Sequence, residues 1–446
     1  MDSLSPMRRQ EILAALRRGA VPSAGLDLLA VGLERFEDAL DEELEHVSMG
    51  HGSFKAVRGE YGTGKTFFTR WLQQRAEDKG FATAEVQISE TETPLHRLET
   101  VYRRAMERLK LRNTSSGALQ DIIDQWFFAL EQDVSTLPDV DWEDDEAVEG
   151  AIGDLMEQRL ATIARNTPQF AATLRAYHSA EIEGDVATAQ GLMSWLSGQP
   201  NVAASVKRKA ELKGDIDHFG ALSFLEGLLV VLRDSGRKGL VLVLDEVETL
   251  QRVRSDVREK SLNALRQWID EVDGGRFPGL YLVITGTPAF YEGPQGVQRL
   301  APLAQRLHTD FMEDTRWDNP RAVQLRLTGM DRARLIEVGL KIRDIYAHGS
   351  EQQARIMELC DDAYVELLAD AISGNFGGKI KVAPRLFLKK LVADILDRID
   401  QFEDFDPRKH YKLTVTRNEM TPEERAAVTS VDDIDLDLSF DDEDEL

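Results

Sequence analysis

Residues 59–68 read "GEYGTGKTFF" and directly follow the apolar-rich run "SFKAV". The first eight of them match GxxxxGK[ST], a pattern in which glycines let backbone N–H groups converge on a phosphate. The flanking residues predict a short strand over Phe54–Val57 and a helix from about Lys65 to Asp78. A phosphate-binding loop needs this order of strand, loop and helix. Four matched positions alone would also fit a glycine turn that merely connects two elements.

The rest of the chain predicts a parallel α/β sheet. Further strands are expected in "FATAEVQIS" (81–89), "LVLVLDE" (240–246), "PGLYLVITGTP" (278–288) and "RAVQLRLTGM" (321–330). Continuous runs of Leu and Val are typical of strands that are buried on both faces. Helical patterns alternate with these strands, which indicates the P-loop NTPase class of fold.

At 446 residues the chain is too long for one ordinary core, and its pattern divides it into four parts. An N-terminal helical segment (1–50) is expected on the adenine side of a core (51–329). A helical lid domain (330–402) follows, and then a polar and finally acidic tail (403–446), with disorder expected from Thr421. This order is that of an AAA-type, origin-recognition-like ATPase with its lid. Residues 113–215 lack strand signals and predict a large helical insertion, whose length suggests a partner or substrate surface.

Composition limits the partners. The formal charge is −25, and subtracting the nine acidic charges of residues 431–446 still leaves −16. A broadly basic nucleic-acid surface is therefore absent, and the cluster Lys207–Lys209 is better explained as a solvated helix face than as a phosphate contact. DNA is the least supported partner.

The lone cysteine, Cys360, excludes an intramolecular disulfide and any multi-thiolate zinc site, which fits a reducing cytosol and a cytoplasmic location. The N-terminus lacks an uninterrupted apolar signal segment. No stretch approaches 18 apolar residues, so neither a membrane span nor a membrane partner is expected.

The loop itself predicts binding of ATP with Mg²⁺. Backbone groups of Gly59, Gly62 and Gly64 would surround the β-phosphate, with the N-terminus of the following helix adding partial positive charge. Lys65 would bridge β- and γ-phosphate oxygens, and the Thr66 hydroxyl would ligate Mg²⁺. The other loop positions assigned to nucleotide binding are Glu60, Tyr61, Thr63 and Phe67.

An acidic pair ends the strand "LVLVLDE", at the edge where open α/β sheets bind nucleotides. Asp245 can hold Mg²⁺, and Glu246 can orient and deprotonate an attacking water. Such a pair could also be a polar strand cap. Paired with a preceding phosphate loop it favours a site, and Glu246 favours hydrolysis over passive binding.

Polar residues also end the next strand, where Thr285 and Thr287 lie in "LVITGTP". A polar side chain there positions the hydrolytic water or senses the γ-phosphate, and Thr285 is the preferred candidate. A threonine that only caps the turn is the alternative.

Arginines complete many such sites by stabilising the charge of the transferred phosphoryl group. In "QRLAPLAQRLHTDF" we expect Arg306, or second Arg299, to reach a neighbouring subunit, which would imply a homo-oligomer. In "VAPRLFLKK" Arg385 occupies the place of a sensor arginine. Each could instead be a surface or salt-bridging arginine.

Adenine needs an apolar slot rather than a motif. Val21, Pro22, Val31 and Gly32 precede the first strand, where such ATPases enclose the base. The same residues could simply pack against the sheet.

With these residues in place, the chain resembles the BREX-system ATP-binding proteins of the D type, a P-loop family associated with bacterial defence against phage. The resemblance rests on the loop region, on the strand-end segment "GLVLVLDEVETLQRVRSDVREKSLNALRQ", and above all on the longer stretch "VQISETETPLHRLETVYRR". It covers most of the chain, except residues 113–215 and the tail. It implies an ATPase that works with other defence-system proteins to block phage while distinguishing host DNA by methylation.

The leading hypothesis is therefore an ATPase that hydrolyses Mg-ATP to switch or assemble a defence complex. A nucleotide-gated scaffold that binds a partner protein with little turnover is the alternative. Duplex translocation is the least favoured, because no helicase motif set and no basic segment after the lid are found.

Overall fold

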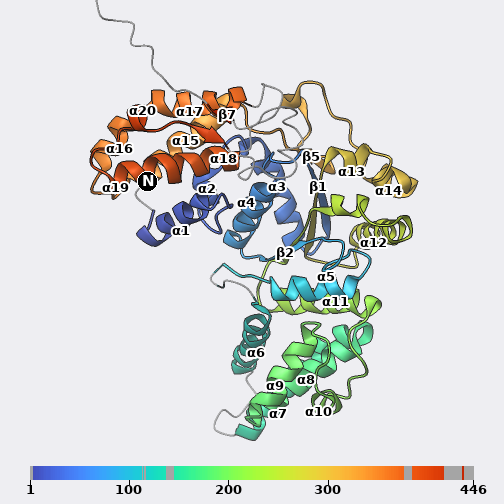
Figure 1. The fold of residues 1–446 in the computed structure, drawn as a ribbon. Coiled ribbons are helices and arrows are strands. Elements are labelled where there is room, and N and C mark those ends of the chain that lie inside the picture. Colours follow the sequence, from blue (N-terminus) through green and yellow to red (C-terminus); the bar gives the residue numbers. More distant parts are fainter. Residues whose placement is uncertain are drawn as a thin grey trace, which may run out of the picture.

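The computed structural model describes residues 4–112, 114, 117–136, 145–375, 384–415 and 434–435. At its centre is a parallel five-stranded sheet in the order β2-β3-β4-β1-β5. Figure 1 shows this sheet in the middle of the fold, with β1, β2 and β5 labelled. Its strands are β1 (Ser53–Arg58), β2 (Ala82–Gln87), β3 (Leu240–Asp245), β4 (Leu280–Gly286) and β5 (Gln324–Arg326). The predicted α/β class is confirmed.

One strand is much shorter than its sequence pattern predicts. The expected fifth strand covered residues 321–330, but β5 has only three residues. It is an edge strand that pairs with the end of β1 alone, from Ala56 to Arg58. An edge strand has a partner on one side only, and natural edge strands are often short.

Helices cover both faces of the sheet. In β3, Val241 and Val243 pack on one face and the intervening leucines on the other, because successive side chains of a strand point to opposite sides. The first face is covered by α3 (Glu34–Ser48) and α4 (Lys65–Asp78). The second is covered by α5 (Leu98–Glu107), α11 (His218–Asp234) and α12 (Ser255–Asp273). The bounds of α4 are those predicted from the sequence.

Short elements connect the later strands. They are η1 (Val247–Gln251), α13 (Pro288–Glu292), η2 (Val297–Arg299), α14 (Ala301–Arg306) and η3 (Thr315–Trp317). Of these, η1 follows β3 and α13 follows β4, so both begin at the edge of the sheet where the strands end.

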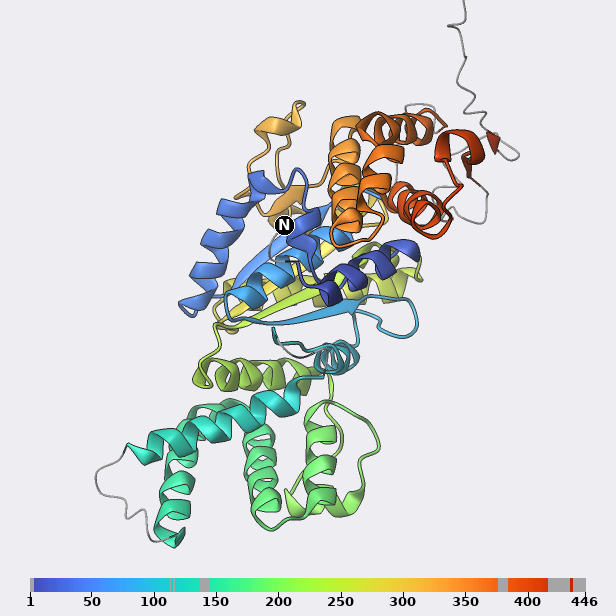
Figure 2. The same ribbon diagram turned by 90° about the vertical axis from the view of Figure 1, so that its left-hand side faces the viewer.

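Between α5 and α11, the described residues form helices joined by turns and loops. The helices are α6 (Leu119–Ser135), α7 (Asp145–Asn166), α8 (Pro168–Ile182), α9 (Val186–Leu196) and α10 (Ala204–Lys209). Figures 1 and 2 show these helices projecting from the sheet, on the side opposite the C-terminal helices. Their apolar side chains belong to the same core as α5 and α11, which anchor the projection to the sheet.

The C-terminal helices form a second core, which includes the chain's first helix. They are α15 (Arg332–Ala347), α16 (Gln353–Leu359), α17 (Asp362–Asn375), α18 (Pro384–Lys389), η4 (Lys390–Leu396) and α19 (Asp397–Gln401). Ile12, Leu13 and Leu16 of α1 (Pro6–Arg17) pack among them. Arg17 adds two hydrogen bonds of 2.7 Å to the carboxylate of Asp397. The segment 1–50 is thus divided, since α1 joins the C-terminal helices whereas α3 joins the sheet.

The tail after residue 402 has some described structure. It includes α20 (Pro407–His410) and the antiparallel pair β6 (Thr414–Val415) with β7 (Ile434–Asp435). The predicted disorder from Thr421 otherwise falls outside the described residues. Within the described part of the chain, no helix is long and apolar enough to cross a membrane.

Candidate functional site: the phosphate loop and its pocket

The loop between β1 and α4 depends on glycine conformation. Gly62 and Gly64 have φ values of 76° and 91°, in the region that side chains disfavour. A Cβ atom added to Gly64 would meet no atom within 4 Å, so the backbone angle, rather than crowding, requires glycine there. The loop then leads straight into the first turn of α4, whose exposed N–H groups can bind an anion.

Lys65, the first residue of α4, is buried and turned toward the loop. Its Nζ donates hydrogen bonds to the carbonyl oxygens of Gly59 at 2.9 Å and Glu60 at 3.3 Å. The ring of Tyr61 lies on another side, with its centroid 5.1 Å from Nζ. The ammonium group therefore lies within the curve of the loop.

Asp245 is held between two hydroxyl groups from different elements. Thr66 Oγ1 donates to Asp245 Oδ2 at 3.3 Å, and Thr285 Oγ1 donates to Asp245 Oδ1. Burial raises the pKa of Asp245, and the Thr285 hydrogen bond opposes that rise. The ends of β3 and β4 and the start of α4 thus meet at this carboxylate.

Glu246 adopts a backbone conformation that is uncommon for a residue with a side chain. Its φ of 60° and ψ of 43° are left-handed, which costs about 1–2 kcal/mol in an L-residue. The turn directs its N–H to Thr285 Oγ1 at 3.0 Å. Its carboxylate accepts a hydrogen bond of 2.9 Å from Gln87 Nε2, at the end of β2. Strained backbone of this kind tends to occur at functional sites.

The residues at the end of the phosphate loop are suited to binding a nucleotide together with Mg²⁺. Mg²⁺ is usually held by one or two protein oxygen ligands together with phosphate oxygens and waters. Thr66 Oγ1 and Asp245 Oδ2, 3.3 Å apart, are two adjacent oxygen atoms at the end of the loop that could serve as such ligands. Among the described residues, no group of three or more His, Cys, Asp or Glu side chains could hold a metal by itself. A site completed by phosphate oxygens is consistent with both observations.

Glu248 is a further acidic residue at the phosphate end, and sequence reasoning did not select it. Its side chain is 3% exposed and its Oε1 lies 3.8 Å from Lys65 Nζ. Neither carboxylate oxygen has a hydrogen-bond partner in another described residue. Burial raises the pKa of Glu248, and the positive charge of Lys65 opposes the rise.

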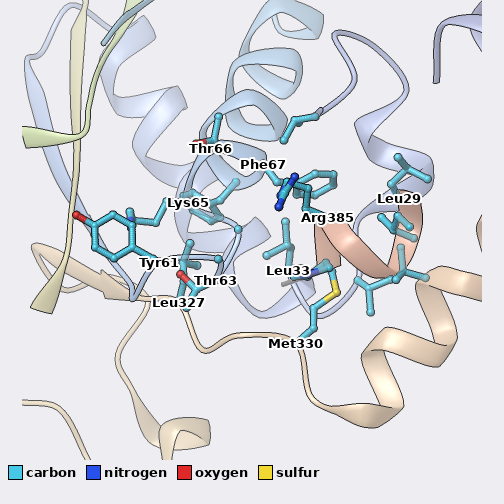
Figure 3. A pocket seen from close by; sticks show the side chains of 18 of the residues that line it. Leu29, Leu33, Tyr61, Thr63, Lys65, Thr66, Phe67, Leu327, Met330 and Arg385 are labelled. Carbon is cyan, nitrogen blue, oxygen red and sulfur yellow. The ribbon is translucent and has the colours of Figure 1, made fainter. Parts of the chain in front are cut away.

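A pocket of about 540 Å³ extends from the loop to the second core. Figure 3 shows Tyr61 and Lys65 at one end, Leu29 at the other and Arg385 between them. Much of its lining is apolar and comes from segments far apart in the sequence: Leu16, Val21, Pro22, Leu29, Val31, Leu33, Phe67, Met330, Val338 and Leu388. Arg35 and Arg334 line the pocket as well. An apolar slot beyond a phosphate loop is suited to a nucleotide base.

Most residues predicted for the site come together here. Tyr61 through Phe67, Asp245, Glu246, Arg385 and all four adenine candidates line the pocket. Gly59 and Glu60 contribute carbonyl groups behind it, and Thr285 is fully buried behind Asp245. Thr287, the other strand-end threonine, is the N-cap residue of α13 but makes no side-chain cap hydrogen bond.

Arg306 and Arg299, the two arginines expected to reach a neighbouring subunit, do not lie in this pocket. Arg306 forms ion pairs with Asp270 at 2.6 Å and Asp273 at 2.8 Å, both near the end of α12. Arg299 donates to Ser255 Oγ at 3.4 Å, at the start of the same helix. Neither lines the pocket of its own chain.

Gln87 was missed although a sequence signal pointed to it. It is the last residue of β2 and is paired in register with Asp245. The reasoning that selected Thr285, a polar side chain at the end of a strand, also applies to Gln87. Met330, Val338 and Leu388 had no such signal, because their place in the pocket depends on how the C-terminal helices pack.

Comparison with known protein families gives a match over nearly the whole chain. Residues 4–415 match the model of the family described as "BREX system ATP-binding protein BrxC/D". No curated protein matches the chain. The family match agrees with the phosphate loop and the nucleotide-sized pocket, and it makes the other proteins of a BREX defence system the expected partners. Because the match covers nearly the whole chain, this protein belongs to the BrxC/D family of ATP-binding proteins of BREX defence systems.

Proposed function

We propose that this protein is an AAA-type ATPase of the D type that hydrolyses Mg-ATP to switch or assemble a BREX defence complex. The observation that carries the proposal is the convergence on Asp245. Thr66 from the phosphate loop and Thr285 from the neighbouring strand both donate to its carboxylate, and Glu246 follows directly. A metal ligand beside a candidate general base is the arrangement that hydrolysis requires.

The roles follow from position and chemistry. Lys65 binds the β- and γ-phosphates, and Thr66 and Asp245 hold Mg²⁺, which neutralises phosphate charge when bound. Glu246 orients the attacking water and accepts its proton, while Thr285 fixes the turn that carries Glu246. Arg385 lines the pocket between its phosphate and base ends, and is suited to sense the nucleotide from the C-terminal helices, which act as the lid.

Oligomerisation is part of the proposal. Arg306 is 42% exposed and its ion pairs with Asp270 and Asp273 hold it on the outer side of α12. Because Arg306 does not line its own pocket, we expect it to act in the site of a neighbouring subunit. Turnover per subunit is therefore expected to rise with protein concentration.

The alternative function, a nucleotide-gated scaffold with little turnover, is favoured by one specific observation. Gln87 holds the carboxylate of Glu246 at 2.9 Å, which competes with binding of a water by the same oxygen. The projecting helices α6–α10 would then bind the partner protein. DNA contact has no comparable support, and a cytoplasmic location remains our expectation from the cysteine content.

Glu246→Gln separates these functions. If the site hydrolyses ATP, this variant keeps ATP binding within about threefold and loses turnover by about 10²-fold or more, since it lacks the general base. Turnover and binding would be measured across a protein concentration series, with Glu259→Gln on the exposed face of α12 as the matched control. Equal turnover in Glu246→Gln and wild type would overturn the assignment. Tight binding without wild-type turnover would favour the scaffold.

A further inference from the structure

The phosphate end of the pocket contains a buried carboxylate to which the proposed hydrolysis gives no role. Glu248 lies in η1, three residues beyond Asp245, and its side chain is 3% exposed. No side chain and no other described residue donates a hydrogen bond to its oxygens, and only its own backbone N–H helps to stabilise the charged form. A buried carboxylate without a hydrogen bond from another residue is costly for folding, so its presence calls for another explanation.

The nearest cation is the lysine of the phosphate loop. Lys65 Nζ lies 3.8 Å from Glu248 Oε1, and both side chains are more than nine-tenths buried. The ammonium group donates its hydrogen bonds to the carbonyl oxygens of Gly59 and Glu60, so the contact with Glu248 is mainly electrostatic. A buried pair of charges is screened much less than a surface pair.

The other groups around Glu248 also make Lys65 its main electrostatic partner. The negative charges nearest to Glu248 are Asp245 and Glu246 on its own segment. Tyr291 of α13 is buried on another side; its hydroxyl also lacks a described partner, and its pKa is raised by burial and by the charge of Glu248. Lys65 is therefore the cation that acts most directly on Glu248, while Arg252, which contacts the Tyr61 hydroxyl, also lines this end of the pocket.

We propose that Glu248 is a positioning residue that competes with the nucleotide phosphates for Lys65. It draws the ammonium group toward η1, and a triphosphate must overcome that attraction before Lys65 can bridge its oxygens. The carboxylate also repels the most negative end of the nucleotide. Glu248 thus lowers the affinity for ATP, and by more than it lowers the affinity for a nucleotide without β- and γ-phosphates. This inference rests on the proposed binding of ATP at the loop.

The test compares ATP with AMP in variants of Glu248. Glu248→Gln removes the charge at nearly constant volume, and Glu248→Met removes it without adding a hydrogen-bond donor. Dissociation constants would be measured at pH 8, where the carboxyl group is more fully ionised, by displacement of a fluorescent ADP analogue. We expect ATP to bind about tenfold more tightly to both variants, while AMP changes by no more than about twofold.

Two controls separate charge from packing. Glu248→Asp keeps the charge and is expected to bind ATP within about threefold of wild type, and Glu259→Gln on the exposed face of α12 is expected to match wild type. Unchanged or weaker ATP binding in Glu248→Gln and Glu248→Met overturns the inference. An equal gain for ATP and AMP, or a full gain in Glu248→Asp, also overturns it. Failure of wild type to bind ATP would instead overturn the proposed function, and this inference with it.

Discussion

The two ends of the pocket are built in different ways. The phosphate end consists of residues close together in the sequence, Gly59 to Thr66, joined by the ends of β3 and β4. The base end combines α1 and the loop after it with residues more than 300 positions later, such as Met330 and Leu388. Polar, specific contacts dominate the first end, and apolar packing dominates the second.

This difference separates two properties of binding. Charge and hydrogen bonds at the phosphate end should set affinity for any triphosphate. Apolar area at the base end should distinguish a nucleotide from a bare polyphosphate. The base end also connects the sheet to the second core, so a bound base would hold the two together.

Removing the ammonium group of Lys65 should have the largest effect on ligand affinity, and this effect should not depend on whether the ligand carries a base. Lys65→Ala is expected to weaken ATP and inorganic tripolyphosphate alike, each by about 10²-fold, because both lose a charge-assisted contact. Calorimetric titration of each ligand measures this. Lys79→Ala, which removes a lysine at the other end of α4, is the matched control and should bind as wild type does. A loss confined to ATP would show that the two ends are not independent.

Truncating Met330, at the base end, should reduce ligand affinity by less, and only for a ligand that carries a base. Met330 is half-buried and lines the pocket opposite the loop. Met330→Ala is expected to weaken ATP about fivefold through lost apolar contact, and to leave tripolyphosphate unchanged. Met357→Ala, on α16, controls for a general loss of methionine packing. Equal weakening of both ligands would contradict the division of the pocket.

The connection between α1 and the C-terminal helices should have the smallest effect on binding. Arg17→Ala removes the two hydrogen bonds to Asp397, which is also bound by the Tyr346 hydroxyl at 2.8 Å. We expect a loss of about 1 kcal/mol of stability, lowering the thermal midpoint by about 2 °C, with ATP affinity changed by no more than about twofold. Arg332→Ala, which breaks an exposed ion pair with Asp370, should shift the midpoint by less. An ordering of the two shifts opposite to this would show that α1 is not anchored through Arg17.

The phosphate end could be predicted from the sequence because its parts are local. The strand, the glycine loop and α4 lie in one stretch, and the strand-end rule added Asp245, Glu246 and Thr285. The same rule could have added Gln87. Glu248 could not be predicted, because only the turn at Glu246 and the packing of η1 make it buried beside Lys65.

The base end was only partly predictable. Val21, Pro22, Val31 and Gly32 were selected by their position before β1, and they do line the pocket. Residues 1–50 were expected on the adenine side as a whole, but Leu16 of α1 was not selected, because an amphipathic helix indicates that it has a partner without indicating which one. Met330 and Leu388 are apolar residues in helical or connecting segments, and nothing local distinguishes them from ordinary core residues.

The most direct test of this account is a crystal structure with Mg²⁺ and a non-hydrolysable ATP analogue. The account predicts the β- and γ-phosphates within the loop at Lys65, the metal at Thr66 and Asp245, and the adenine between Leu33 and Met330. A nucleotide bound elsewhere, or phosphates in the loop with the base outside the apolar end, would contradict it.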